Sequence, residues 1–141
     1  MSAYVDSSVL LRLVLGQPHR LREWRTIERG VASALVEVEC LRTLDRLRLR
    51  AAVSDREIAI RREALFRLLD SLDIVELGAS VLSRAAQPMP TELGTLDAIH
   101  LATALLWRDA SGSDLVMATH DSALALAARA SGLEAIGVAS G

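Results

Sequence analysis

The chain has 141 residues, of which 51% are hydrophobic and 3% aromatic, and its formal net charge is −2. A chain of this length forms one domain with a sizeable core, so we predict a single domain over residues 1–141. The small negative charge excludes a general attraction to nucleic acid, and binding a polyanion would need a local basic patch or a bound cation. All 16 basic residues are arginine, and the absence of lysine argues against Walker-type phosphate loops and Schiff-base chemistry.

The sequence also indicates where in the cell the protein is expected to be. Charged residues interrupt every apolar stretch well before it reaches membrane-spanning length, and the N-terminal residues include Asp6 but no basic leader. Cys40 is the only cysteine, which excludes an internal disulfide and a thiolate metal cluster. We therefore expect a cytoplasmic protein without a membrane partner.

The first half of the chain predicts strands that alternate with helices. Residues 3–5 form an apolar run that ends at Asp6, and a helix follows with Ser7 or Ser8 as its N-cap and Gly16 at its end. Residues 21–29 are charged and amphipathic, which predicts a helix closed by Gly30. The other elements predicted up to residue 77 are a strand at 31–34, a helix at 35–49, a helix from the capping box at 54–57 to residue 72, and a strand at 73–77.

The second half continues the alternation. Its predicted elements are a short helix ending at 86, a loop with Pro88 and Pro90, a helix at 95–109, a strand at 115–118, an alanine-rich helix at 123–129 and a strand at 134–138. Strands that alternate with helices in this way are typical of a parallel sheet with helices on both faces. We therefore predict a three-layer α/β/α sandwich with a central, mostly parallel sheet.

Acidic residues follow several of the predicted strands, where ligands of such sheets bind. Asp6 ends the first strand, Asp121 lies three residues after the fourth, and Asp97 lies in the first turn of a long apolar helix. Glu37 and Glu39 follow the second strand, and because they project about 200° apart on a helix, only one is expected to face the others. Four converging carboxylates need cations, and their oxygen atoms suit Mg²⁺ or Mn²⁺, ions that serve phosphodiester chemistry.

Each of these side chains also has a simpler interpretation. An aspartate at a strand end or a helix start is a common cap or turn former. His100 lies one turn after Asp97 and could border a site or pack in the core, while His120 could contact a substrate or lie in an exposed loop. Acids interleave with the arginines between 42 and 67, which favours a solvated surface over an RNA-binding face. The apolar stripes of the same helices could serve the core, a dimer face or a groove for a partner helix.

Four segments, in order, resemble the PIN domain, and specifically the VapC-type toxins of bacterial toxin–antitoxin pairs. They are YVDSSVLL, SALVEVECLRTL, LGTLDAIHLATAL and MATHDSALALAARASGL. The match of the second segment places the family's glutamate at Glu39. His120 stands where the family often has an aromatic residue.

The resemblance implies an Mg²⁺- or Mn²⁺-dependent endoribonuclease that is inhibited by a cognate antitoxin and is usually a homodimer. A metal-activated water would hydrolyse the RNA and leave a 5′-phosphate and a 3′-hydroxyl. The residues implied are Asp6, Glu39, Asp97 and Asp121 as ligands of the ion, directly or through water, and Ser7 and Thr119 as groups that orient the carboxylates or the substrate.

Two alternatives remain open at this point. The chain could be a PIN-like binding or scaffold module without turnover, or a nuclease on the same scaffold that acts on DNA or on a particular nucleic-acid structure. Residues 17–30 and 53–90 carry no diagnostic motif, and substrate and antitoxin specificity are expected to lie there.

Overall fold

A five-stranded sheet forms the centre of the computed structural model, which describes residues 1–51 and 53–139. Its strands are β1 (Ser2–Val5), β2 (Arg29–Ser33), β3 (Asp73–Val75), β4 (Val116–Ala118) and β5 (Glu134–Ile136). The order across the sheet is β3-β2-β1-β4-β5, and all four neighbouring pairs are parallel. The predicted parallel sheet is therefore confirmed, and β1 lies at its centre.

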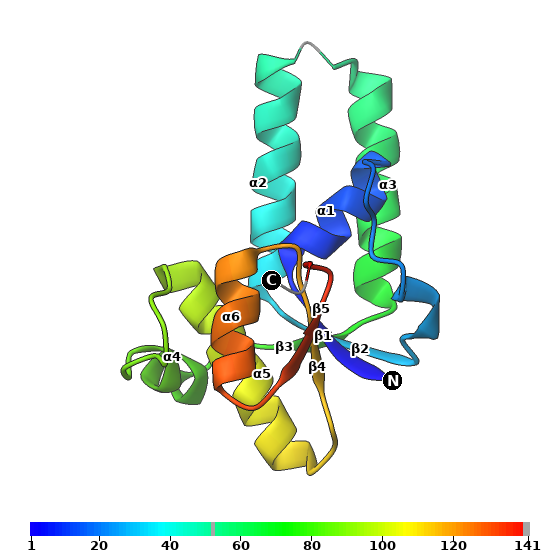
Figure 1. Cartoon of the computed structure of the whole chain (residues 1–141). Helices are drawn as coiled ribbons and strands as arrows, with labels where there is room; N and C mark the ends of the chain where they lie inside the picture. The colour runs from blue at the N-terminus through cyan, green and yellow to red at the C-terminus, as the bar shows by residue number, and fades with distance from the viewer. Residues whose placement is uncertain (52, 140–141) are drawn as a thin grey trace.

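Helices cover both faces of this sheet (Figure 1). They are α1 (Ser7–Leu15), α2 (Leu35–Arg50), α3 (Asp55–Asp70), α4 (Ala79–Ala85), α5 (Thr95–Ser111) and α6 (Ser122–Ala130). Successive side chains of a strand point to opposite faces, so Val5 packs with α1, α2 and α3 while Tyr4 packs with α5 and α6. Two apolar clusters thus lie on either side of the sheet, and the predicted three-layer sandwich is confirmed.

Helices α2 and α3 form a long hairpin that extends away from the sheet (Figure 1). The predicted capping of α3 is present, since the Ser54 hydroxyl oxygen accepts a hydrogen bond from the Glu57 backbone N–H at 3.1 Å. The apolar stripe of α2 is buried at Val36, Cys40 and Leu44. Core packing therefore accounts for much of the stripe.

The helix predicted at 21–29 is wrong. Only a 3₁₀ turn forms there, at Trp24–Thr26, and Leu21 is buried with Trp24 and Ile27 packed beside the same core. A spacing of three residues fits one tight turn better than an α-helix. Gly30 lies inside β2 rather than at a helix end, and a Cβ there would lie 2.4 Å from Leu72 Cδ2.

Strands β3 and β5 each end two residues earlier than predicted, at Val75 and Ile136. After β5 the chain turns at Gly137, whose φ of 101° is unfavourable for other residues.

Within the described part of the chain, no helix is long and apolar enough to cross a membrane.

Candidate active site

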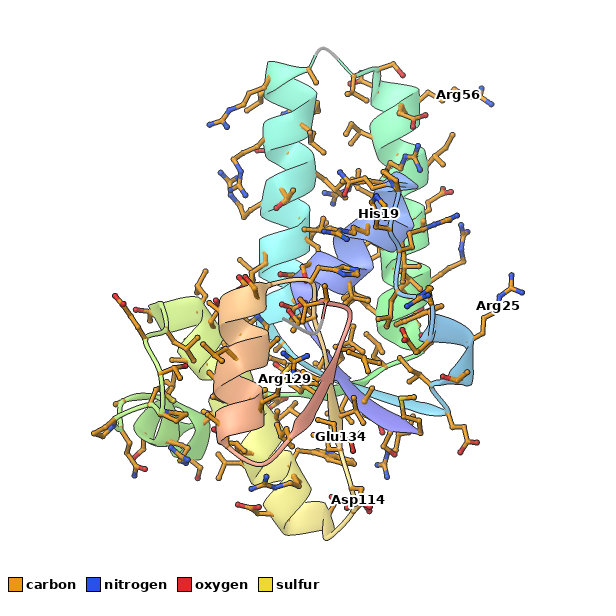
Figure 2. All side chains as sticks on the ribbon, viewed as in Figure 1. His19, Arg25, Arg56, Asp114, Arg129 and Glu134 are labelled. Carbon is orange, nitrogen blue, oxygen red and sulfur yellow. The ribbon has the colours of Figure 1, made fainter. Side chains whose placement is uncertain are left out.

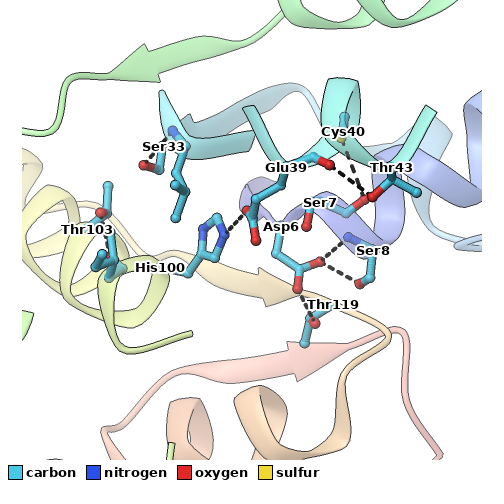
Figure 3. Close-up of polar contacts among 12 residues, drawn as sticks. Asp6, Ser7, Ser8, Ser33, Glu39, Cys40, Thr43, His100, Thr103 and Thr119 are labelled. Carbon is cyan, nitrogen blue, oxygen red and sulfur yellow. Dashed lines mark hydrogen bonds and ion pairs between the residues drawn. The ribbon is translucent and has the colours of Figure 1, made fainter. Parts of the chain in front are cut away.

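Asp6 directly follows β1 at the carboxyl edge of the sheet and is almost fully buried, with 3% of its surface exposed. Its Oδ1 accepts hydrogen bonds from the Ser8 backbone N–H at 3.1 Å and the Ser8 hydroxyl at 2.6 Å. Its Oδ2 accepts one from the Thr119 hydroxyl at 2.8 Å (Figure 3). Asp6 is also the N-cap of α1, so the prediction of Ser7 or Ser8 as that cap is wrong.

The loop after β4 joins this arrangement through Thr119, which is fully buried. Its hydroxyl oxygen accepts from the Asp121 backbone N–H at 3.0 Å, while the His120 backbone N–H donates to the Ser8 hydroxyl oxygen at 2.9 Å. The Asp121 carboxylate accepts from two backbone N–H groups in the first turn of α6. Two hydroxyls thus fix the loops that carry Asp6 and Asp121 relative to each other.

Ser8 is a site residue that the sequence analysis missed. The predicted partner of the carboxylate was Ser7, but among the described hydrogen bonds the hydroxyl that reaches Asp6 belongs to Ser8. Ser7 contributes its backbone carbonyl, 4.0 Å from Cys40 Sγ. The signal in the sequence was Asp6 itself. An aspartate at a helix N-cap commonly accepts a hydrogen bond from the backbone N–H two residues further on, which brings Ser8 beside the Asp6 carboxylate.

Glu39 is held by a buried chain of side chains that begins on β1. Its Oε1 lies 2.6 Å from His100 Nε2 (Figure 3), and His100 Nδ1 lies 2.6 Å from the Tyr4 hydroxyl. A carboxylate only accepts, so Nε2 carries the hydrogen, and the Tyr4 hydroxyl can then donate to Nδ1. Burial raises the pKa of Tyr4 well above its ordinary value, which keeps that hydroxyl protonated.

His100 combines the two roles left open by the sequence. It is a packed core residue with 1% of its surface exposed. It is also the donor to Glu39 through its Nε2–H, and the contact of its Nδ1 with Tyr4 orients the ring. Glu37 is exposed on the same helix whereas Glu39 is not. The structure therefore places Glu39, rather than Glu37, towards the carboxyl edge of the sheet.

Asp97 lies in the first turn of α5, where the partial positive charge of the helix end favours a carboxylate. Burial nevertheless raises the pKa of Asp97 to about 6, and the nearby charges of Asp121, Asp6 and Glu39 act in the same direction. Burial likewise raises the pKa of Asp6, against the hydrogen bonds from Ser8 and Thr119. The other three carboxylates are therefore close enough to Asp97 for their charges to affect its pKa.

The carboxylate oxygens of Asp6, Glu39, Asp97 and Asp121 are the type of ligand that a hard cation such as Mg²⁺ prefers. None of the four carboxylates is paired with an arginine in the described part of the chain, so their mutual repulsion is left for a cation to relieve. Yet among residues 1–51 and 53–139 no three His, Cys, Asp or Glu side chains are grouped closely enough to hold an ion together. An ion here would keep part of its water shell, as Mg²⁺ commonly does, and the ligand roles stay predictions.

A comparison with protein families identifies residues 3–130 as a PIN domain. The chain belongs to the PIN-domain family. Among individual PIN-domain proteins, it is 39% identical over 104 residues to Ribonuclease VapC46 of Mycobacterium tuberculosis (strain ATCC 25618 / H37Rv), a match that covers 72% of each chain. It is 36% identical over 103 residues to Ribonuclease VapC47 of Mycobacterium tuberculosis (strain CDC 1551 / Oshkosh), covering 72% of this chain and 73% of that one.

The fold has counterparts among solved PIN-domain structures. A toxin–antitoxin complex from Klebsiella pneumoniae contains a chain that matches with a TM-score of 0.64 at 18% identity, covering 98% of this chain and 96% of that one. At this identity the likeness concerns the fold. The resemblance inferred from four short segments is thereby confirmed at the level of family and architecture.

Proposed function

We propose that this PIN domain is an endoribonuclease, the toxin of a toxin–antitoxin pair, and that it hydrolyses RNA phosphodiester bonds with the help of Mg²⁺ or Mn²⁺. The observation that carries the proposal is the geometry at the carboxyl edge of the sheet, where Ser8 and Thr119 hold the buried Asp6 carboxylate and His100 holds Glu39. Asp121, Asp6 and Glu39 are also close enough to Asp97 to help raise its pKa. Two relatives that cover 72% of the chain are named ribonucleases, which supports RNA as the substrate class.

The four carboxylates would have different roles in holding the ion. A divalent ion, when bound, would neutralise charge on the phosphate and help to generate the attacking hydroxide. Asp6, fixed by Ser8 and Thr119, and Glu39, fixed by His100, would present oxygen atoms in constant positions. Asp97 makes no comparable bond among the described contacts, so it would be the carboxylate most free to adjust to the ion and its waters.

The direct test is digestion of total cellular RNA by the purified chain with Mn²⁺, with Mg²⁺ and with a chelator, followed by sequencing of the cut ends. We expect cleavage with the ions, at a limited set of positions, with 5′-phosphate and 3′-hydroxyl ends. Cleavage should stop in the chelator because the ion that would neutralise charge on the phosphate and help to generate the hydroxide is removed. Intact RNA in all conditions, or equal cleavage with the chelator, would contradict the proposal.

We also propose an antitoxin protein as the partner, a homodimer as the active form and the cytoplasm as the compartment. The Klebsiella pneumoniae neighbour is a toxin–antitoxin complex, which supports the first. Large apolar side chains that are not used in the core remain exposed on the α2–α3 hairpin, namely Val38, Leu49, Ile60 and Phe66. Such surface is common where proteins meet, and it supports a protein partner or a second copy without distinguishing them.

A further inference from the structure

A pocket of about 590 Å³ lies beside the acidic residues, and none of the four carboxylates lines it. Three arginines line it, Arg12 from α1 and Arg20 and Arg22 from the loop that follows. The other side consists of His120 and residues 135–139, at and after the end of β5. We call it the arginine pocket. It lies at the ends of β4 and β5, at the same carboxyl edge as Asp6 and Asp121.

The arginine pocket is continuous with the acidic site through His120. This residue directly precedes Asp121, and its backbone N–H donates to the Ser8 hydroxyl that in turn donates to Asp6. Its Nδ1 lies 2.8 Å from the Gly137 carbonyl oxygen, whereas its Nε2 is buried without a partner among the described residues. His120 therefore belongs both to the lining of the pocket and to the hydrogen-bond network around Asp6.

The walls of the pocket are fixed by specific contacts. Leu21, between the two loop arginines, is buried in the core. Arg12 Nη1 donates to the His19 carbonyl oxygen at 2.9 Å, which holds a loop whose His19 has a φ of 61°, rare for a residue other than glycine. On the other side, a Cβ at Gly137 would lie 2.3 Å from the Thr119 carbonyl oxygen. The pocket therefore does not have to be ordered by its ligand.

The lining of the pocket carries a net positive charge, with three arginines and one acid. Five arginines outside the pocket lie within 3.2 Å of a carboxylate, namely Arg29, Arg42, Arg48, Arg61 and Arg108. In the part of the chain that the structure describes, the three pocket arginines form no such pair, and Glu23 is the one acid among the lining residues. The planar guanidinium group matches a phosphate with two parallel hydrogen bonds. A protein of net charge −2 needs such a local patch to hold RNA.

We propose that the arginine pocket binds a backbone phosphate of the RNA strand next to the bond that is cut. This inference rests on the proposed ribonuclease function and adds to it a site for the neighbouring part of the substrate. It assigns a role to residues 17–30, a segment without a diagnostic motif, and it predicts that Arg20 and Arg22 act on RNA affinity rather than on the chemical step.

The test compares two double variants that remove the same charge, each in an Asp97→Asn chain so that RNA stays intact. One is Arg20→Ala/Arg22→Ala in the pocket, and the control is Arg50→Ala/Arg56→Ala at the tip of the α2–α3 hairpin, where Figure 2 shows the Arg56 side chain directed outward. Fluorescence anisotropy with a labelled single-stranded RNA gives the Kd over a range of salt concentrations, and a thermal melt checks that each variant is folded.

We expect the pocket variant to raise the Kd about tenfold or more, because charge-assisted hydrogen bonds to phosphate are lost. Its salt dependence, the slope of log K against log salt, should fall in magnitude by about 0.7, since the loss of one phosphate contact to a single strand changes the slope by about 0.7. The control should shift the Kd by less than about twofold, as expected for exposed charges outside the contact. Equal losses in both double variants, or an unchanged Kd in the pocket variant, would overturn the proposal.

The same variants in the active chain separate this inference from the function on which it rests. If RNA is never cut and the pocket variant still weakens binding selectively, the ribonuclease proposal fails and the pocket stands. If RNA is cut and the pocket variant binds and cuts like the parent, the pocket fails and the ribonuclease stands.

Discussion

Replacing Asp97 by asparagine should reduce RNA cleavage by at least about 100-fold while leaving the fold intact, because one charged oxygen donor to the ion is lost. The side chain makes no hydrogen bond that the rest of the described structure needs. The measurement is the initial rate of cleavage of one RNA in excess Mn²⁺. Asp109→Asn, at the exposed far end of the same helix, is the matched control and should keep the parent rate. Parent-like cleavage by Asp97→Asn would exclude this carboxylate from the chemistry.

The same variant has an expected effect on stability that depends on pH. Burial and the neighbouring carboxylates raise the pKa of Asp97 to about 6, so the folded protein disfavours the charged form. The parent should therefore lose stability relative to Asp97→Asn as the pH rises from about 4, its ordinary pKa, through 6, and the difference should stay constant above that. Thermal melts in a chelator across this range test the sign. A variant that becomes less stable than the parent at high pH would contradict the repulsion among the carboxylates.

Replacing Asp6 by alanine should destabilise the fold by about 2–4 kcal/mol, because a helix cap is lost and buried donors are left without an acceptor. The donors are the Ser8 N–H and hydroxyl and the Thr119 hydroxyl. Denaturant unfolding measures the change, and Asp114→Ala, an exposed loop carboxylate, is the control, which should change little.

Asp6→Asn separates the structural from the chemical role of this residue. Since burial raises the pKa of Asp6, removing its charge is not itself costly to the fold, and the amide oxygen can still accept from Ser8. We expect most of the stability to remain while cleavage is lost. Equal stability of Asp6→Ala and the parent would show that the hydrogen bonds around Asp6 do not hold the two loops together.

The sequence was sufficient to predict the layered parallel sheet because alternating strands and helices permit few other arrangements. The sequence also predicted that Asp6 and Asp121 lie at one edge, since both follow strands and the carboxyl ends of parallel strands meet there. The helix predicted at 21–29 was wrong because apolar residues three apart also fit a single 3₁₀ turn. Gly30 does not end a helix but allows the side chain of Leu72 to lie close to β2.

The supporting residues were harder to predict because their contacts bridge distant segments. Tyr4 and His100 are 96 residues apart, and His100 and Glu39 are 61 apart. No local pattern specifies that a helix histidine meets both a strand tyrosine and a glutamate on another helix. Periodicity also left Glu37 and Glu39 equivalent, and only the packing of α2 on the sheet distinguished them.

If the four carboxylates from four separate segments act as one cation site, Mn²⁺ should bind to the parent protein in a saturable way. Calorimetric titration of Mn²⁺ into the parent, Asp97→Asn and Asp109→Asn measures this. We expect saturable binding by the parent and by Asp109→Asn, and affinity about 10–100-fold weaker for Asp97→Asn. Absence of saturable binding by the parent, or equal affinity in all three proteins, would contradict a single cation site.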